Sequence, residues 1–261
     1  SAIEVMNAEL SRPKWTDSHC HLPEDLDKCL EILNDAASAG VDRLIDVGTD
    51  VSRSRAAIGR AETYENVFAT AGVHPHDAEA GIEGLEELLA NESVVAVGEC
   101  GLDYHYDYSN REAQKISFAE QIKLAHEYDL ALVIHSRSAW DDTFDILDAE
   151  GMPDRTVFHC FTGGAPEAKK ALDRGAFLSF SGIVTFKNAP EVREAAALVP
   201  KNRYLIETDA PYLAPIPNRG KPNQPAWVAI VGESLAVTRE SSSLVVARET
   251  WANASELYKL P

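Results

Sequence analysis

Residues 94–135 read VVAVGECGLDYHYDYSNREAQKISFAEQIKLAHEYDLALVIH and contain one complete strand–helix–strand unit. The six residues at the start and the five at the end are short apolar runs, which are typical of buried parallel strands. Between them, residues 110–129 carry an apolar stripe at helical spacing. The stripe consists of Ile116, Phe118, Ala119, Ile122 and Ala125. The stretch therefore predicts two parallel strands joined by a covering helix.

The same alternation of strand and helix continues in both directions along the chain. Further strand candidates are residues 15–21, 43–48, 67–73, 156–161, 176–182 and 203–209. Two of the helical segments between them end at a glycine, Gly40 and Gly175, as helices commonly do. Eight strands alternating with helices predict an α/β fold, a single-domain (β/α)8 TIM-type barrel over residues 15–261, preceded by an N-terminal extension, residues 1–14. An open doubly wound sheet is the alternative, but no Gly-x-Gly-x-x-Gly turn follows the first strand.

Composition limits the class of protein. A chain of 261 residues, 45% of them hydrophobic, can bury a sizeable core. The net charge of −18 argues against a protein that coats long nucleic acids, yet it permits an enzyme that handles a phosphate through metal ions. We expect no membrane span and no secretory signal, because long apolar runs are missing. The four cysteines form no Cys-x-x-Cys pair, which indicates a reducing, cytoplasmic setting.

A His-x-His pair lies in residues 15–22, WTDSHCHL. On a strand, residues two apart point to the same side, so His19 and His21 project together. Such a pair can chelate one metal ion. Taken alone, it fits equally well two polar residues that enter a loop.

Other metal-binding side chains stand at the ends of further predicted strands. Glu99 ends the fourth strand, His135 the fifth and Asp209 the eighth, and His159 lies near the end of the sixth. In α/β barrels, the rim formed by these strand ends is where active sites are built. We therefore expect all of these side chains to meet the histidine pair in one site.

The ligand types favour divalent metal ions, one or two per chain, such as Mg, Mn or Zn. Glu99 is the candidate bridge between two ions. One ion is assigned to His19, His21, Glu99 and Asp209, and the other to Glu99, His135 and His159. In two-metal sites the ions lie about 3.5–4 Å apart and lower the pKa of a bound water toward neutrality. That water is the expected nucleophile, and Asp209 the group that takes its proton.

Six short motifs occur in a fixed order: DSHCHL, GVHPH, GECGLDY, IHSR, FHCFTG and ETDAPYL. With this set, the sequence resembles the TatD family of metal-dependent deoxyribonucleases, within the amidohydrolase superfamily, from about residue 15 to about residue 228. The resemblance implies a TIM-type barrel, one or two divalent metals and phosphodiester hydrolysis in DNA, often from the 3′ end. It assigns metal binding to the positions of His19, His21, Glu99, His135, His159 and Asp209.

Contacts to substrate are expected around this centre. His74, in GVHPH, is predicted to face the mouth of the site and donate to a phosphate or to the departing group. Arg219 and Lys221, in the proline-rich loop 210–225, are the expected phosphate contacts. Arg137 fits either a phosphate contact or a surface salt bridge. Relatives often have Arg-Gly-Lys-Arg-Asn-Glu-Pro where this chain has RGKPNQP, so one base and one acid are missing.

Three further residues have two interpretations each. Asp103, in GLDY, either orients a ligand histidine or caps a turn. Phe161 and Tyr212 either stack on a base or simply pack.

Three functions remain open from the sequence. The first is a metal-dependent phosphodiesterase that acts on single-stranded DNA ends in the manner of a 3′–5′ exonuclease, without a membrane or an obligate protein partner. The second is an ester or amide hydrolase on the same scaffold, such as an aminoacyl-tRNA deacylase, which the acidic surface favours. The third is a non-catalytic metal-binding or partner-binding protein.

Overall fold

The computed structural model describes the backbone of all 261 residues and the side chains of residues 1–7 and 11–261. Eight strands form one sheet in the order β1 to β8, and each pairs in parallel with the next. The strands are β1 Trp15–Cys20, β2 Val41–Val47, β3 Val67–Ala71, β4 Val94–Asp103, β5 Ala131–Arg137, β6 Thr156–Phe158, β7 Phe177–Phe180 and β8 Tyr204–Ile206. The predicted TIM-type barrel is confirmed.

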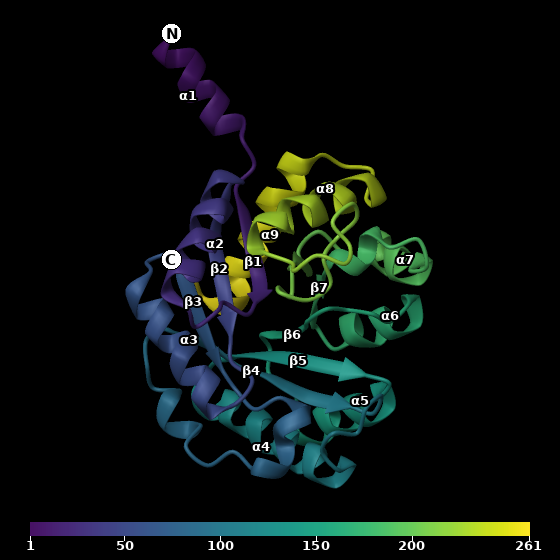
Figure 1. Cartoon of the computed structure of the whole chain (residues 1–261). Helices are drawn as coiled ribbons and strands as arrows, with labels where there is room; N and C mark the ends of the chain where they lie inside the picture. Colours follow the sequence, from purple (N-terminus) through teal and green to yellow (C-terminus); the bar gives the residue numbers. More distant parts are fainter.

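Helices surround the strands, and α1 projects away from the barrel (Figure 1). They are α1 Ala2–Ser11, α2 Leu26–Ser38, α3 Val51–Thr63, α4 Arg111–Glu127, α5 Trp140–Glu150, α6 Ala165–Asp173, α7 Pro190–Leu198, α8 Val228–Thr238 and α9 Ser243–Tyr258. Strict alternation fails after β3, where the connection contains the short 3-10 helices η1 Pro75–Ala80 and η2 Glu86–Leu88. Two more, η3 Gly182–Thr185 and η4 Pro225–Trp227, follow β7 and β8. No helix in the described part of the chain is both long and apolar enough to cross a membrane.

Local signals explain where several helices begin and end. Asp25, Asp50 and Asn110 each accept a hydrogen bond from the backbone N–H three residues later, which satisfies a donor that the helix itself leaves free. Gly40 and Gly175 follow α2 and α6 with φ of 82° and 85°. This left-handed conformation favours glycine, so the helix ends predicted at these two positions are confirmed.

The core has two layers because successive strand residues point to opposite faces. Leu44 belongs to the layer between strands and helices, and its neighbour Ile45 belongs to the layer inside the barrel. Tyr258 of α9 packs into the inner layer. Asn253, also on α9, donates to the backbone carbonyl of Tyr204 at the start of β8. The C-terminal helix therefore covers the end of the barrel at which the strands begin.

The last strand region joins the first through backbone and side-chain bonds. The N–H of Asp209 donates to the carbonyl of His19 at 2.8 Å, and the N–H of His21 donates to the carbonyl of Ala210 at 2.9 Å. The buried carboxylate of Asp17 accepts from the N–H of Thr208 at 2.9 Å and from its hydroxyl at 2.5 Å. These bonds place His19 beside Asp209, although 190 positions separate them in the sequence.

Some predicted boundaries were wrong. The fourth strand does not end at Glu99 but continues to Asp103, with an irregular register between Val97 and Cys100. In α4, Ile116 is 54% exposed and lies outside the buried face. Instead, the polar side chains of Gln114 and Gln121 are buried on this helix.

Candidate metal centre

The other five predicted metal-binding side chains lie together around Glu99, which is almost completely buried. Its two carboxylate oxygens face different imidazoles. Oε1 lies 3.1 Å from Nε2 of His19 and 3.7 Å from Nε2 of His21. Oε2 lies 3.1 Å from Nδ1 of His135 and 2.9 Å from Nε2 of His159. Glu99 therefore has one oxygen toward each half of the cluster.

Asp209 stands on the half that contains the His-x-His pair. Its Oδ1 lies 3.5 Å from Nε2 of His19 and 3.3 Å from Nε2 of His21. The residue follows β8 by three positions and has a left-handed φ of 55°, an uncommon conformation outside glycine. The Asp209 side chain is 14% exposed, against 4% for Glu99. Of these two carboxylates, Asp209 is the more open to solvent.

Three of the imidazoles are oriented by hydrogen bonds from the ring nitrogen that points away from the centre. Nδ1 of His21 donates to the carbonyl of Val47 at 2.9 Å. Because a carbonyl can only accept, Nδ1 holds the hydrogen in the neutral ring and Nε2 keeps its lone pair. Carboxylates play the same part for His135 and His159. This arrangement is typical of histidines that bind metal ions.

Asp103 is the carboxylate that orients His135. Its Oδ2 lies 2.9 Å from Nε2 of His135 and 3.0 Å from Nε2 of His76. Gln114 of α4 accepts from the Asp103 N–H at 2.8 Å and donates to the Asp103 carbonyl at 3.1 Å. Gln121 holds the backbone of Val73, next to His74, in the same way. These two pairs of hydrogen bonds explain why glutamines occupy the buried face of α4.

Glu207 orients His159, and sequence reasoning missed it. Its side chain is fully buried, Oε2 lies 3.0 Å from Nδ1 of His159, and Oε1 accepts from the N–H of Cys160 at 2.7 Å. The available signal was a charged residue at the end of the apolar run 203–209. A carboxylate in such a run needs a buried partner.

The donor set fits divalent metal ions. In the described part of the chain, two buried side-chain nitrogens have no hydrogen-bond partner, Nδ1 of His19 and Nε2 of His159. An unsatisfied buried polar atom calls for an explanation such as an ion, and Nε2 of His159, which faces Glu99, is placed to bind one. The facing imidazole nitrogens and carboxylate oxygens lie 2.9–3.7 Å apart. This spacing matches two ligand atoms that each lie about 2.0–2.2 Å from one shared ion. Three compact groups of possible ligands lie among the described residues: His19, His21 and Glu99; His74, Glu99 and His135; and His19, His159, Glu207 and Asp209.

Electrostatics keep the two carboxylates ionised. Burial raises the pKa of Glu99, but the nearby His159 and His74 and hydrogen bonds from imidazoles outweigh it, so the pKa lies well below its usual range. Burial raises the pKa of Asp209, but its hydrogen bond with His21 and the nearby histidines together outweigh burial, so the pKa is likewise lowered. Burial lowers the pKa of His21, but that hydrogen bond and the charge of Asp209 more than reverse this, raising the pKa to about 9.

His74 lies beside Glu99, with its ring arranged to donate a hydrogen bond. Nδ1 of His74 accepts from the N–H of His76 at 3.0 Å. Burial lowers the pKa of His74 despite the nearby Glu99, so the ring is neutral at pH 7 and its hydrogen is on Nε2. That Nε2 lies 3.2 Å from Oε2 of Glu99.

The predicted basic contacts lie outside this cluster. Arg137 is exposed, and its guanidinium lies 5.1 Å from the ring centre of Tyr106. Arg219 lies over the ring of Phe186 at 3.9 Å, and Lys221 is exposed two positions later. The structure brings none of the three cations into contact with the six clustered side chains. Of the two aromatic candidates, Phe161 is buried and packs in the core, whereas Tyr212 is 61% exposed.

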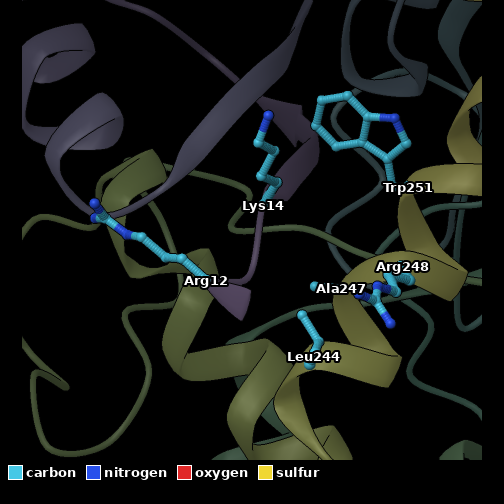
Figure 2. A pocket seen from close by; sticks show the side chains of 6 residues that line it. All are labelled: Arg12, Lys14, Leu244, Ala247, Arg248 and Trp251. Carbon is cyan, nitrogen blue, oxygen red and sulfur yellow. The ribbon is translucent and has the colours of Figure 1, made fainter. Parts of the chain in front are cut away.

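A separate hollow of about 170 Å³ lies at the opposite end of the barrel, where β1 begins. Its lining consists of Arg12, Lys14, Leu244, Ala247, Arg248 and Trp251 (Figure 2). Arg12 donates to the carbonyl of Ser38 at 2.5 Å and is turned away from Lys14. Because no imidazole or carboxylate lines this hollow, it offers no metal ligands or general base.

Comparison with known proteins identifies the family. The family model described as TatD related DNase matches residues 16–259. A Bacillus subtilis protein named as an uncharacterized metal-dependent hydrolase, YabD, is 41% identical over 94% of this chain and 98% of its own. The Cronobacter sakazakii protein named 3'-5' ssDNA/RNA exonuclease TatD is 35% identical over 87% of this chain and 90% of its own.

A solved structure of similar shape supports the assignment. The TatD homologue YJJV from Escherichia coli K12 superposes with a TM-score of 0.87 at 31% identity, covering 95% of this chain and 98% of its own. The six ligand-type side chains lie in one cluster at the carboxyl ends of the strands of the same barrel. The chain belongs to the TatD family of metal-dependent hydrolases.

Proposed function

We propose that this protein is a divalent-metal-dependent phosphodiesterase that shortens single-stranded DNA from its 3′ end. The observation that carries the proposal is the position of Glu99, with Oε1 facing His19 and His21 and Oε2 facing His135 and His159. A carboxylate placed between two sets of imidazoles would serve two ions at once, and paired ions of this kind support phosphodiester cleavage.

The ligands divide into two sets in this proposal. One ion, Mg, Mn or Zn, would be held by His19, His21, Glu99 and Asp209, and a second by Glu99, His135 and His159. When bound, such ions polarise a phosphate and activate a water molecule as the nucleophile. Asp103 and Glu207 hold His135 and His159 in the orientation that binding needs.

The remaining steps belong to side chains of this chain. Asp209, the carboxylate more open to solvent, accepts the proton of the attacking water. His74 donates from Nε2 to a phosphate oxygen or to the departing oxygen, because its Nδ1 is already occupied by the N–H of His76. Arg137, Arg219 and Lys221 supply positive charge for the phosphates that flank the bond to be broken. The Cronobacter relative, named as a ssDNA/RNA exonuclease, supports nucleic acid as the substrate.

The test is a nuclease assay on metal-stripped protein reloaded separately with Mg, Mn or Zn. A single-stranded oligonucleotide labelled at its 5′ end is expected to shorten progressively from the 3′ end, and a chelator is expected to stop the reaction. His135→Ala should abolish cleavage. His126→Ala, which removes an exposed histidine on α4, is the matched control and should retain it. Failure of all three metal-loaded forms to shorten the oligonucleotide would overturn the proposal.

The acidic surface favours a second candidate, an ester or amide hydrolase such as an aminoacyl-tRNA deacylase. With a net charge of −18, long-range repulsion opposes the approach of a polyanion. The same reloaded protein should therefore be assayed against aminoacyl esters and amides. Faster turnover of these substrates than of any oligonucleotide would favour this candidate.

A further inference from the structure

Two exposed tyrosines lie on the loop between β4 and α4. The side chains of Tyr106 and Tyr108 are 50% and 64% exposed. Their rings are stacked, with centres 5.1 Å apart and planes within 16° of each other. Large aromatic side chains are normally buried, so an exposed pair of parallel rings presents a flat apolar surface to the solvent.

This tyrosine pair is connected to the metal centre. The ring of Tyr108 lies 4.7 Å from that of His76, edge to face at 84°. His76 shares Oδ2 of Asp103 with His135, and the rings of His76 and His135 are 6.2 Å apart. The pair therefore stands beside the His135 half of the cluster: Tyr108 contacts His76, and His76 lies next to the predicted ligand His135.

A cation accompanies the pair. The guanidinium of Arg137 lies 5.1 Å from the ring centre of Tyr106. Among the described side chains, no carboxylate forms an ion pair with Arg137, so its charge is available to an incoming anion. An aromatic surface can stack on a base, and the neighbouring arginine, which has no ion-pair partner, can bind the phosphate attached to that base.

A third exposed tyrosine stands beside the other half of the cluster. The ring of Tyr212 is 6.2 Å from that of His21, and the side chain is 61% exposed. The backbone around it is fixed: its N–H donates to the carbonyl of Asp209 at 2.9 Å, and its carbonyl accepts from Asn223 at 2.8 Å. Exposed aromatic rings thus flank the metal centre on the His135 side and on the His21 side.

We propose that Tyr106 with Tyr108, and Tyr212, stack on unpaired nucleobases on either side of the phosphate that is cleaved, and so select single-stranded nucleic acid. This inference rests on the proposed nuclease function. In a duplex, neighbouring base pairs cover both faces of a base, whereas an unpaired base can turn onto an aromatic ring. Stacking of this kind tolerates any base sequence, so the selection is for strandedness and not for sequence.

The test compares a single-stranded oligonucleotide with one that has the same backbone but abasic residues in its last few positions. Wild-type protein is expected to show about a tenfold or larger rise in KM on the abasic substrate, with a smaller change in kcat. The double variant Tyr106→Ala/Tyr108→Ala, and Tyr212→Ala separately, should raise KM for the normal oligonucleotide and lose much of this difference. Replacement of the same residues by Phe, which keeps the ring, should restore it.

Binding is measured in parallel without turnover. Fluorescence anisotropy of a labelled oligonucleotide, recorded in chelator, should show weaker binding by the Ala variants and wild-type binding by the Phe variants. Equal KM values on normal and abasic substrates together with equal binding by wild type and Ala variants would overturn the inference. In that case, shortening of both oligonucleotides would leave the proposed function intact. If the Ala variants bind the oligonucleotide more weakly than wild type but no form of the protein cleaves it, the inference is supported while the nuclease proposal fails.

Discussion

The backbone N–H of Asp209 donates to the backbone carbonyl of His19 at 2.8 Å, and this bond lies where the barrel closes. The same two residues place their side chains 3.5 Å apart in the candidate metal centre. Closing the barrel and assembling the ligands are therefore one structural event. A change that loosens the contact between β1 and the region after β8 should weaken both the fold and the binding of metal.

Thr208→Val tests this link. The Thr208 hydroxyl is bonded to the buried carboxyl group of Asp17, so the variant leaves that group without one of its partners. We expect a loss of about 1–3 kcal/mol in the free energy of unfolding, measured with urea, together with weaker zinc binding. The control is Thr63→Val, because Thr63 is an exposed threonine at the end of α3 and its replacement should change stability by less than about 0.5 kcal/mol. Equal effects of the two variants would contradict the argument.

The fold was predictable because its signal is local. Each strand of a barrel covered by helices is an apolar run that can be read without knowing its neighbours, and all eight runs correspond to strands. The six clustered side chains were predictable for a related reason. Parallel strands bring their carboxyl ends to one rim, so residues 19 to 209 meet there whatever their separation in the sequence.

The predictions that failed concern polar residues whose roles depend on partners distant in the sequence. Glu99 was predicted to end the fourth strand, yet β4 continues past it and the carboxylate is surrounded by imidazoles. Gln114 lies outside the apolar stripe predicted for α4, yet it is buried and binds the backbone of Asp103. Glu207 was missed because its partner His159 lies 48 positions earlier. Polar residues buried for one specific contact carry no periodic pattern.

A glycine contact gives a test of the packing between α8 and β1. A Cβ atom built on Gly232 would lie 2.2 Å from the ring of Trp15, which is buried at the start of β1. Gly232→Ala should therefore lower the free energy of unfolding by about 1–3 kcal/mol through overpacking. Gly59→Ala, in α3 with open space around the position, should raise it by about 0.5–1 kcal/mol because alanine favours the helix. Thermal unfolding of both variants measures the difference, and a loss of stability in Gly59→Ala would count against this reading.

Glu207→Gln tests whether the Glu207 carboxylate orients the His159 ring for metal binding. A glutamine amide can present its NH2 group to Nδ1 and so allow the wrong nitrogen to hold the hydrogen. We expect zinc affinity to fall about 10- to 100-fold, measured by competition with a chromophoric chelator, since outer partners of metal-binding histidines have effects of this size. Glu87→Gln, at an exposed site on η2, is the control and should bind zinc as wild type does. An unchanged affinity in Glu207→Gln would show that the His159 ring is held by packing alone.

Metal binding should depend on pH through His21. In the metal-free protein its pKa is raised to about 9, so the ring is protonated at pH 7 and must lose a proton before Nε2 can bind an ion. Zinc affinity is therefore expected to rise with pH and to level off above about pH 9. The proton also stabilises the metal-free fold: that contribution is complete below about pH 6.5, the ordinary pKa of histidine, and is lost as the pH rises through about 9.

Calorimetry in two buffers with different ionisation enthalpies gives the number of protons released when zinc binds. Wild-type protein should release about one more proton at pH 7 than His21→Ala, and identical proton release by the two would refute the assignment of His21 as a ligand that is protonated before the metal binds.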